Sequence, residues 1–273
     1  MTNLQELKFK NSKKKHPGSA NNYLRFILFS LLGNALLLAQ TTQAHEKNSL
    51  ADNFSINLNL KNMHLWHGSI VTPGIMMATA MEYQSDNKKF ILGLWGGAST
   101  DGDYKEFSYY TSYMPGNNFS ISLISHNNYS NSDDVDIFSY DKHTSPNFVD
   151  VVFEYTGSTD FPLSIYWSTI LFGNGGDYTT SSDGTVTDSY STYTELRYQF
   201  FREQETQLTL FAGGAFSPTT RKTFYSERAN ITNFGLTLNR NVDFLSRAFP
   251  VVATAFWNPE TKEGALQLDI KLF

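Results

Sequence analysis

The chain contains no cysteine, which excludes disulfide bridges and thiolate metal sites. Beyond residue 39 it also lacks any apolar run approaching the about 20 residues that a membrane-spanning helix needs. Basic residues are outnumbered by acidic ones, with 21 lysines and arginines and 26 aspartates and glutamates. A chain of this charge lacks the basic surface that binding to nucleic acid requires. No segment beyond the N-terminal region has a helical apolar stripe, so the absences favour a protein built from strands.

The first 44 residues have the layout of a secretory signal peptide. Six basic residues and Glu6 precede the apolar run 26–39, and Thr42-Gln43-Ala44 places small residues where signal peptidase reads them. That run is too short to cross a bilayer as a helix. We predict cleavage after Ala44 and a mature domain of residues 45–273. Of the charged residues, six basic and one acidic lie before the cut, which leaves 15 and 25 and a net charge of −10.

Strict alternation of apolar and polar residues predicts β-strands along the mature chain. Phe54, Ile56, Leu58 and Leu60 form one such series, and the chain ends on another, 264–273. The pattern predicts twelve strands, with ten as the alternative count. They cover residues 53–66, 74–84, 89–98, 104–114, 118–128, 148–156, 162–172, 190–201, 206–216, 230–239, 248–257 and 264–273. The 22 Phe, 15 Tyr and 4 Trp, with a mean hydropathy of −0.34, fit a wall in which alternate residues meet lipid.

The connections between these strands alternate in length. Tight connections are expected at 85–88, 115–117, 157–160 and 202–205, with a somewhat longer one at 240–247, and long ones at 130–147, 173–189 and 217–229. Short and long connections in turn are typical of periplasmic turns and extracellular loops. Because lipid cannot pair with backbone N–H and C=O groups, such strands must close on themselves. We therefore predict an all-β, closed antiparallel transmembrane β-barrel in a Gram-negative outer membrane, preceded by the cleaved signal peptide.

The opposite faces of the strands supply the predicted lumen. An ionised side chain that faced lipid near the midplane would cost about 2–4 kcal/mol, so alternation places these residues inside. The predicted pore-lining residues are Glu82, Glu106, Asp150, Glu154, Glu195, Arg197, Asp269 and Lys271. Acids outnumber bases in this set, and rings of acid favour cations in a pore. The alternative is that Glu195 with Arg197, and Asp269 with Lys271, belong to a structural charge network that holds a narrow barrel shut.

Four stretches near the start of the barrel resemble a known family. They are Leu65-Trp-His-Gly-Ser69, Met81-Glu-Tyr-Gln84, Leu92-Gly-Leu-Trp-Gly-Gly97 and Glu106-Phe-Ser-Tyr109-Tyr110. In their order and spacing they look like the N-terminal region of the TorF-type porins, a family of proteobacterial outer-membrane β-barrel proteins. Two positions depart from that pattern, because His67 stands where the family has Arg and Ser108 where it has Asp. The resemblance implies a barrel that forms a pore, and it names no substrate.

No catalytic or metal-binding constellation stands out. His64 and His67 have the spacing of a helical metal pair, but on a strand they point to opposite faces. Asp133, Asp134 and their neighbours lack the ordered ligand spacing of an EF-hand. We therefore expect no enzyme activity, no metal and no cofactor.

The sequence predicts a pore for passive diffusion of small solutes, with a weak preference for cations. A non-conducting structural or surface-binding barrel is the alternative, and a barrel hydrolase is a third. The expected partners are small solutes or ions, outer-membrane lipid and the outer-membrane assembly machinery, with no nucleic acid. The terminal Phe273 supports assembly, although the apolar residues before it occupy even positions counted back from the end rather than the usual odd ones.

Overall fold

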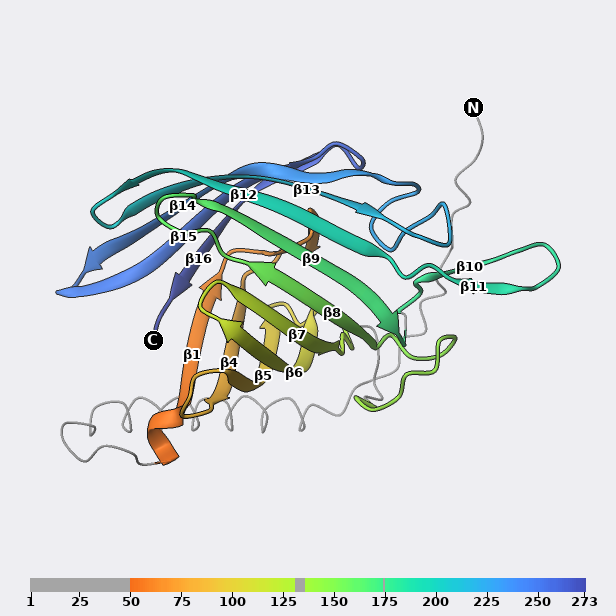
Figure 1. Cartoon of the computed structure of the whole chain (residues 1–273), viewed down its shortest axis with the longest axis horizontal. Helices are drawn as coiled ribbons and strands as arrows, with labels where there is room; N and C mark the ends of the chain where they lie inside the picture. The colour runs from red at the N-terminus through yellow and green to blue at the C-terminus, as the bar shows by residue number, and fades with distance from the viewer. Residues whose placement is uncertain (1–49, 131–135, 174) are drawn as a thin grey trace. The chain divides into compact units, whose positions relative to one another are not determined.

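Twelve antiparallel strands form a closed barrel in the computed structural model (Figure 1). The structure describes residues 50–130, 136–173 and 175–273, so the predicted signal peptide lies outside the described residues. The wall consists of β1 (Phe54–Lys61), β4 (Met76–Gln84), β5 (Phe90–Ser99), β6 (Lys105–Gly116), β7 (Phe119–His126), β8 (Phe148–Tyr155), β9 (Leu163–Phe172), β12 (Thr192–Glu203), β13 (Thr206–Phe216), β14 (Asn230–Phe244), β15 (Arg247–Asn258) and β16 (Glu263–Lys271). The predicted all-β closed barrel of twelve strands is confirmed.

Wall strands pair with their neighbours along the chain, as short connections favour, and β1 pairs with β16 to close the barrel. A 3₁₀ turn, η1 (Leu50–Asn53), precedes β1. Two small hairpins lie outside the wall: β2 (His64–Trp66) with β3 (Ser69–Thr72), and β10 (Tyr178–Thr180) with β11 (Val186–Asp188). Within the described ranges, no helix is long and apolar enough to cross a bilayer.

One end of the barrel carries the tight turns, the start of β1 and the C-terminus, and the other carries the long connections. Long connections lie between β7 and β8, between β9 and β12, and between β13 and β14, as the sequence predicts, and a further one lies between β1 and β4. The prediction for 240–247 is wrong, because β14 and β15 continue through this segment and meet in a two-residue turn, Leu245-Ser246. Both turn residues have positive φ, 49° and 61°, the combination that joins two twisted strands directly.

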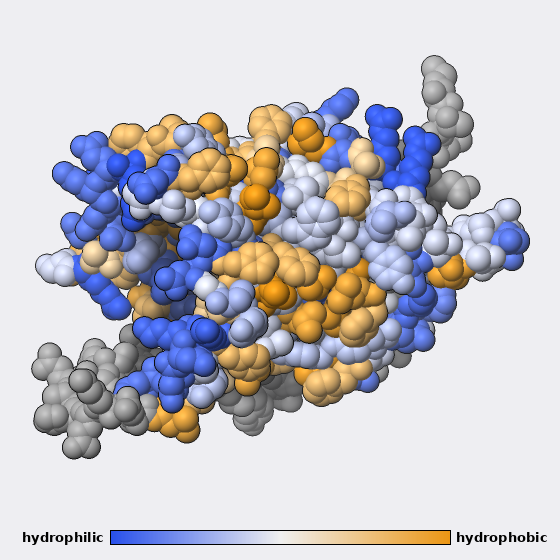
Figure 2. Space-filling view, viewed as in Figure 1, coloured by the Kyte–Doolittle hydropathy of each residue, from blue (hydrophilic) through white to orange (hydrophobic). Residues whose placement is uncertain are grey.

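Side chains alternate across the wall. On β5, Leu92 and Leu94 are exposed on the outside, whereas Gly93 is buried and Trp95 faces inward. The large apolar side chains exposed on other strands include Ile56, Met81, Leu123, Ile165, Leu196, Leu210, Phe234, Trp257, Leu266 and Leu268. Figure 2 shows apolar side chains over the middle of the visible face and hydrophilic ones towards its ends. The barrel is therefore apolar outside and polar inside, the reverse of a water-soluble fold.

Candidate functional site: a lumen divided by an inward hairpin

The chain leaves the wall directly after β1 and enters the barrel. The predicted first strand, 53–66, runs past the observed end of β1 at Lys61. The next residue, Asn62, takes over the pairing with β16: its backbone N–H donates to Leu268 O (3.2 Å) and its side-chain Oδ1 accepts from Leu268 N–H (2.7 Å). Its Nδ2 donates to Leu266 O (3.0 Å). One amide side chain thus replaces the next peptide group of the ladder, and the backbone is free to turn inward.

Residues 62–75, which contain β2 and β3, are called the inward hairpin. Its tip is fastened to β14–β16, called the anchored wall. Gly68 has φ +82°, and a Cβ at this position would lie 2.1 Å from Thr232 O, so only glycine fits. Asn258 Nδ2 donates to Gly68 O (2.9 Å), and Gln267 Nε2 donates to Met63 O (2.7 Å). The hairpin is therefore hydrogen-bonded to one side of the lumen, while the ring of Trp66 at its tip also reaches the ring of His126 on β7, 5.6 Å away between centroids.

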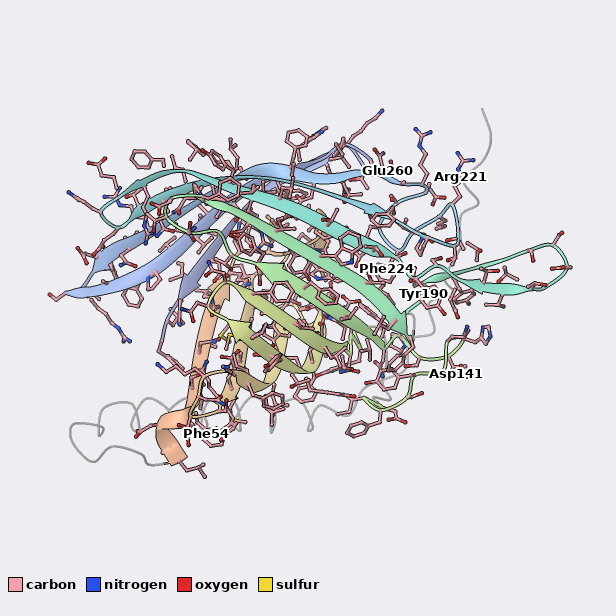
Figure 3. All side chains as sticks on the ribbon, viewed as in Figure 1. Phe54, Asp141, Tyr190, Arg221, Phe224 and Glu260 are labelled. Atoms are coloured by element: carbon pink, nitrogen blue, oxygen red, sulfur yellow. The ribbon has the colours of Figure 1, made fainter. Side chains whose placement is uncertain are left out.

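Aromatic rings pack around the hairpin tip. The imidazole of His67 lies 4.0 Å from the ring of Tyr193 on β12, measured between centroids. The indole of Trp66 lies 5.4 Å from Tyr225 and 5.9 Å from Phe224, both from the connection between β13 and β14. Figure 3 labels Phe224 at the long-loop end, close to the ends of β8 and β9. A loop from the long-loop end thus packs against the hairpin within the barrel.

Two cavities remain on either side of the hairpin. The larger, about 1160 Å³, lies between the hairpin and β6–β8, called the open wall; the smaller, about 550 Å³, lies against the anchored wall. The larger cavity has loop residues 142–146 at one end and Ser112 and Ser122 towards the tight turns. From Asn128 to Ser122 a strand advances about 20 Å at 3.3 Å per residue. This cavity is the candidate solute path, and the aromatic residues along it include Trp66, Trp95, Tyr110, Phe148 and Tyr166.

The predicted interior residues Glu154, Glu195 and Arg197 form one network. Arg197 NH1 lies 3.0 Å from Glu154 Oε1, across the intervening strand β9, and its Nε lies 2.7 Å from Glu195 Oε1. Tyr193 also donates to Glu195, and Asn233 Nδ2 donates to the same carboxylate at 2.8 Å. One guanidinium is thus shared by two carboxylates, and the hydrogen bonds from Tyr193 and Asn233 satisfy Glu195 further, which is the kind of network that the charge-network alternative describes.

Glu106 and Asp150 meet around a histidine that the sequence did not assign to the lumen. His126 Nδ1 lies 3.5 Å from Glu106 Oε1, and its Nε2 lies 3.5 Å from Asp150 Oδ2. Glu106 also accepts hydrogen bonds from Tyr104 OH (2.8 Å) and Ser108 Oγ (3.0 Å). The side chains of Glu106 and His126 line the larger cavity, whereas Asp150 lies behind them and is 1 % exposed.

The remaining predicted residues lie apart from these two groups. Asp269 pairs with Lys61 (3.0 Å) at the seam between β1 and β16 rather than with Lys271 on its own strand. Lys271 is exposed at the tight-turn end. Glu82 accepts a hydrogen bond from Tyr110 OH at 2.5 Å. The structure therefore gathers five of the eight residues into two clusters. Of the other three, Asp269 lies at the seam, Glu82 beside Tyr110 and Lys271 at the rim.

Sequence reasoning missed His126, Tyr104 and Asn233, although each contacts a predicted carboxylate. The alternation of β7 offers a signal for the first, because Ser122, Ile124 and His126 share one face and all line the larger cavity. For Tyr104 the signal is its position two residues before Glu106 in the predicted strand 104–114, which puts both on one face. Asn233 comes from a distant strand, so no local spacing connects it to Glu195.

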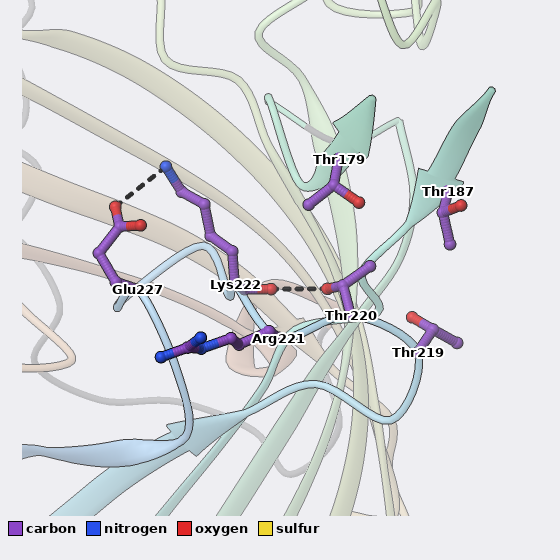
Figure 4. A pocket seen from close by; sticks show the side chains of 7 residues that line it. All are labelled: Thr179, Thr187, Thr219, Thr220, Arg221, Lys222 and Glu227. Carbon is purple, nitrogen blue, oxygen red and sulfur yellow. Dashed lines mark hydrogen bonds and ion pairs between the residues drawn. The ribbon is translucent and has the colours of Figure 1, made fainter. Parts of the chain in front are cut away.

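A further pocket lies at the surface of the long-loop end. It holds about 510 Å³ and is lined by Thr179, Thr187, Thr219, Thr220, Arg221, Lys222 and Glu227 (Figure 4). Lys222 Nζ lies 3.1 Å from Glu227 Oε1, and Thr220 Oγ1 donates to Lys222 O at 2.6 Å. These groups satisfy one another. Among the described residues, no three His, Asp or Glu side chains are grouped to hold a metal ion, while Asp133 and Asp134 lie outside the described residues.

Comparison of the sequence with models of known protein families gives no match, and comparison with curated proteins gives none either.

Proposed function

We propose that this chain is an outer-membrane barrel that conducts small solutes along the cavity between the inward hairpin and the open wall. The observation that carries the proposal is the larger cavity, about 1160 Å³, which extends from loop residues 142–146 to Ser112 and Ser122. A polar, partly charged passage inside an apolar wall is the arrangement of a diffusion pore.

The apolar exterior supports the membrane location. Side chains such as Leu210 and Leu266, 50 % and 54 % exposed, face outward from a wall whose strands are all paired around the ring. Water would make this surface costly, whereas a bilayer accepts it because the backbone groups are satisfied within the barrel. The predicted signal peptide and the resemblance to TorF-type porins agree with this location. The tight turns would then face the periplasm and the long connections the exterior.

A weak preference for cations follows from the count of interior charges. Six carboxylates are predicted to face the lumen, against three basic groups. These are Arg197, Lys61 and the rim residue Lys271. Because most of these charges are paired, the excess field is small, so strong selectivity is not expected. The candidates for carrying it are Glu106 and Glu154, which line the larger cavity, and Glu82, which accepts a hydrogen bond from the cavity-lining Tyr110.

A non-conducting barrel remains the second candidate, since one observation favours it. The inward hairpin is fixed to the anchored wall and packed by Trp66 and Tyr225, so it occupies lumen that a wide pore would leave empty. Such a barrel would serve as a scaffold for its long loops.

Planar-bilayer recordings of the purified, refolded chain test the proposal. We expect small unitary currents and a reversal potential in a salt gradient that indicates a modest cation preference. The triple variant Glu82→Gln, Glu106→Gln and Glu154→Gln should move that potential towards zero, with a smaller shift at high salt because of screening. Glu195→Gln, which lies by the smaller cavity, is the matched control. Absence of current from correctly folded protein would favour the non-conducting barrel.

A further inference from the structure

A two-stranded ribbon extends beyond the rest of the wall at the tight-turn end. On β14, Arg240 is the last residue that pairs with β13, opposite Thr206. On β15, Val251 is the last residue that pairs with β16. Residues 241–250, called the ribbon, continue as a backbone pair with each other, and one side-chain hydrogen bond, from Arg247 to Leu272 O (3.2 Å), ties the ribbon to the end of the chain. Four further residues on β14 add about 13 Å along the strand, and Figure 1 shows these strands reaching past their neighbours.

The ribbon has two chemically different faces. Thr237, Asn239 and Thr254 line the smaller cavity, so alternation fixes which residues face inward and which face outward. On the inward face lie Asn241, Asp243, Ala248 and Pro250. On the outward face lie Val242, Phe244 and Phe249 together with Arg240 and Arg247. The outward face thus continues the apolar exterior of the barrel and adds two cations to it.

The apolar residues of the ribbon are more exposed than a turn in water requires. Val242, Phe244 and Leu245 are 45 %, 64 % and 84 % exposed. Leu245 sits at the tip with φ 49°, where Asn or Gly would adopt the same conformation at lower cost. An apolar side chain in a strained position at an exposed tip is an outlier that points to a binding role.

We propose that the outward face of the ribbon binds the phospholipid headgroup boundary of the leaflet at the tight-turn end, with Phe244 and Leu245 inserted and Arg240 and Arg247 contacting phosphates. The inference rests on the proposed membrane location and goes beyond the proposed pore. A bilayer of 40–45 Å with a hydrocarbon core of about 30 Å leaves roughly 5–8 Å of headgroup region on each side. A ribbon of about 13 Å along a tilted strand spans that region.

The charge distribution favours lipid over a second protein strand. Arginine binds phosphate through a planar fork of donors, and its stem tolerates an apolar surface. The guanidinium of Arg247 lies over the ring of Phe249 at 5.4 Å, so cation and apolar surface already form one unit. Pro250 lacks the N–H that an added strand would need, and a proline on an exposed edge discourages such pairing. Asp243, the acidic residue of the ribbon, lies on the inward face, away from the proposed lipid contact.

Site-specific labels test the proposal, and the absence of native cysteine makes single labels simple. The full chain carrying Leu245→Cys is labelled with an environment-sensitive fluorophore and reconstituted in phosphatidylcholine vesicles with or without phosphatidylglycerol. Nitroxide-labelled lipid with the spin label near the headgroup is the quencher, and iodide is the aqueous quencher. Asp243→Cys, two residues away on the opposite face, is the matched control. Leu210→Cys, exposed on the outside of β13, reports on the membrane location itself.

We expect lipid nitroxide to quench Leu245→Cys several-fold more than Asp243→Cys, and iodide to show the reverse order. Replacing Arg240 and Arg247 by Gln should reduce lipid quenching at the tip in vesicles with phosphatidylglycerol more than in phosphatidylcholine alone. Equal iodide quenching at both ribbon sites, with no lipid quenching at Leu245→Cys, would overturn the inference. Protection from both quenchers that grows with the protein-to-lipid ratio would also overturn it and assign the face to a second copy. Loss of lipid quenching at Leu210→Cys would instead refute the membrane location.

Discussion

The two sides of the lumen are built from the same kind of strand but have opposite roles. On the anchored wall, inward side chains such as Asn258 and Gln267 bind the backbone of the inward hairpin. On the open wall, inward side chains such as Ser112 and Ser122 bind each other at 2.7 Å and leave a cavity beside them. Amide side chains reach across to a neighbouring backbone, whereas serines are too short to do so. The hairpin backbone is therefore hydrogen-bonded on the anchored side, and a cavity remains beside these serines on the open side.

The largest change should follow removal of the inward hairpin. If residues 63–74 are replaced by a short Gly-Ser link, Asn258 and Gln267 of the anchored wall lose their hydrogen-bond partners, and the two cavities merge. We expect the unitary conductance in planar bilayers to rise several-fold. A link of the same composition in place of residues 181–185, which join β10 to β11 and do not line the larger cavity, is the control and should leave conductance unchanged. Equal conductance with and without the inward hairpin would show that it does not constrict the path.

Substitution at Gly68 tests how firmly the tip is seated. Gly68→Ala adds a Cβ 2.1 Å from Thr232 O, whereas Gly102→Ala adds one at a similar φ, +87°, with nothing within 4 Å. The control should cost about 1–2 kcal/mol from the left-handed backbone alone. Gly68→Ala should cost roughly a further 1–3 kcal/mol for the clash. Denaturant unfolding of the refolded protein measures both. Similar losses for the two variants would mean that the hairpin tip moves aside freely.

A pair of side-chain truncations compares the two walls directly. Asn258→Ala removes the donor to Gly68 O and the acceptor of Glu260 N–H, so it should destabilise the barrel by about 1–3 kcal/mol. Ser112→Ala on the open wall should change stability by no more than about 0.5 kcal/mol, since water can reach the groups it leaves. The same unfolding measurement applies. Equal losses would remove the distinction between an anchored and an open wall.

The smallest effect concerns a carboxylate outside both walls. Burial raises the pKa of Asp177 above its ordinary value of 3.8, and the hydrogen bonds from Ser191 offset part of that shift. As the pH rises, the Asp177 carboxyl ionises in the unfolded chain before it does in the folded protein. The unmodified protein should therefore lose stability as the pH rises from 3.8 through the raised pKa. Asp177→Asn should abolish this part of the pH dependence. Stability measured at several pH values checks it, and an unchanged profile in the variant would contradict the assignment.

The barrel itself is predictable from the sequence, because each strand carries its own alternation. The inward hairpin is not, although the alternation changes parity after Leu60, because Asn62 and His64 are polar and Met63 and Leu65 apolar. Nothing local shows that the chain then turns into the barrel. The inward turn depends on Asn62, whose partners Leu266 and Leu268 lie more than 200 residues away. Local spacing likewise paired Asp269 with Lys271, whereas the structure pairs it with Lys61. The alternation along a strand predicts which face a side chain occupies. Its partner depends on which strands the fold brings together.

The ribbon shows a different limit. Residues 240–247 combine Asn, Arg and Asp, a composition that predicts a loop, yet they extend β14 and β15. Turn propensity failed here because Leu245 and Ser246 occupy left-handed positions that Asn and Gly favour. Pairing along the preceding residues, Phe234 with Trp257 and onwards, sets the register and carries the strands through the polar segment.

The attachment of the inward hairpin has a consequence for the order of assembly. Gly68 is fastened by Asn258, a separation of 190 residues, and Met63 by Gln267, a separation of 204. Contacts so distant along the chain form late, because nearly the whole polypeptide must be in place before they can close. The hairpin can therefore reach its seat only after the last two strands have arrived. The barrel passes through a stage in which the wall is nearly complete and its interior is still vacant, and closure of the seam and docking of the hairpin become a single final step.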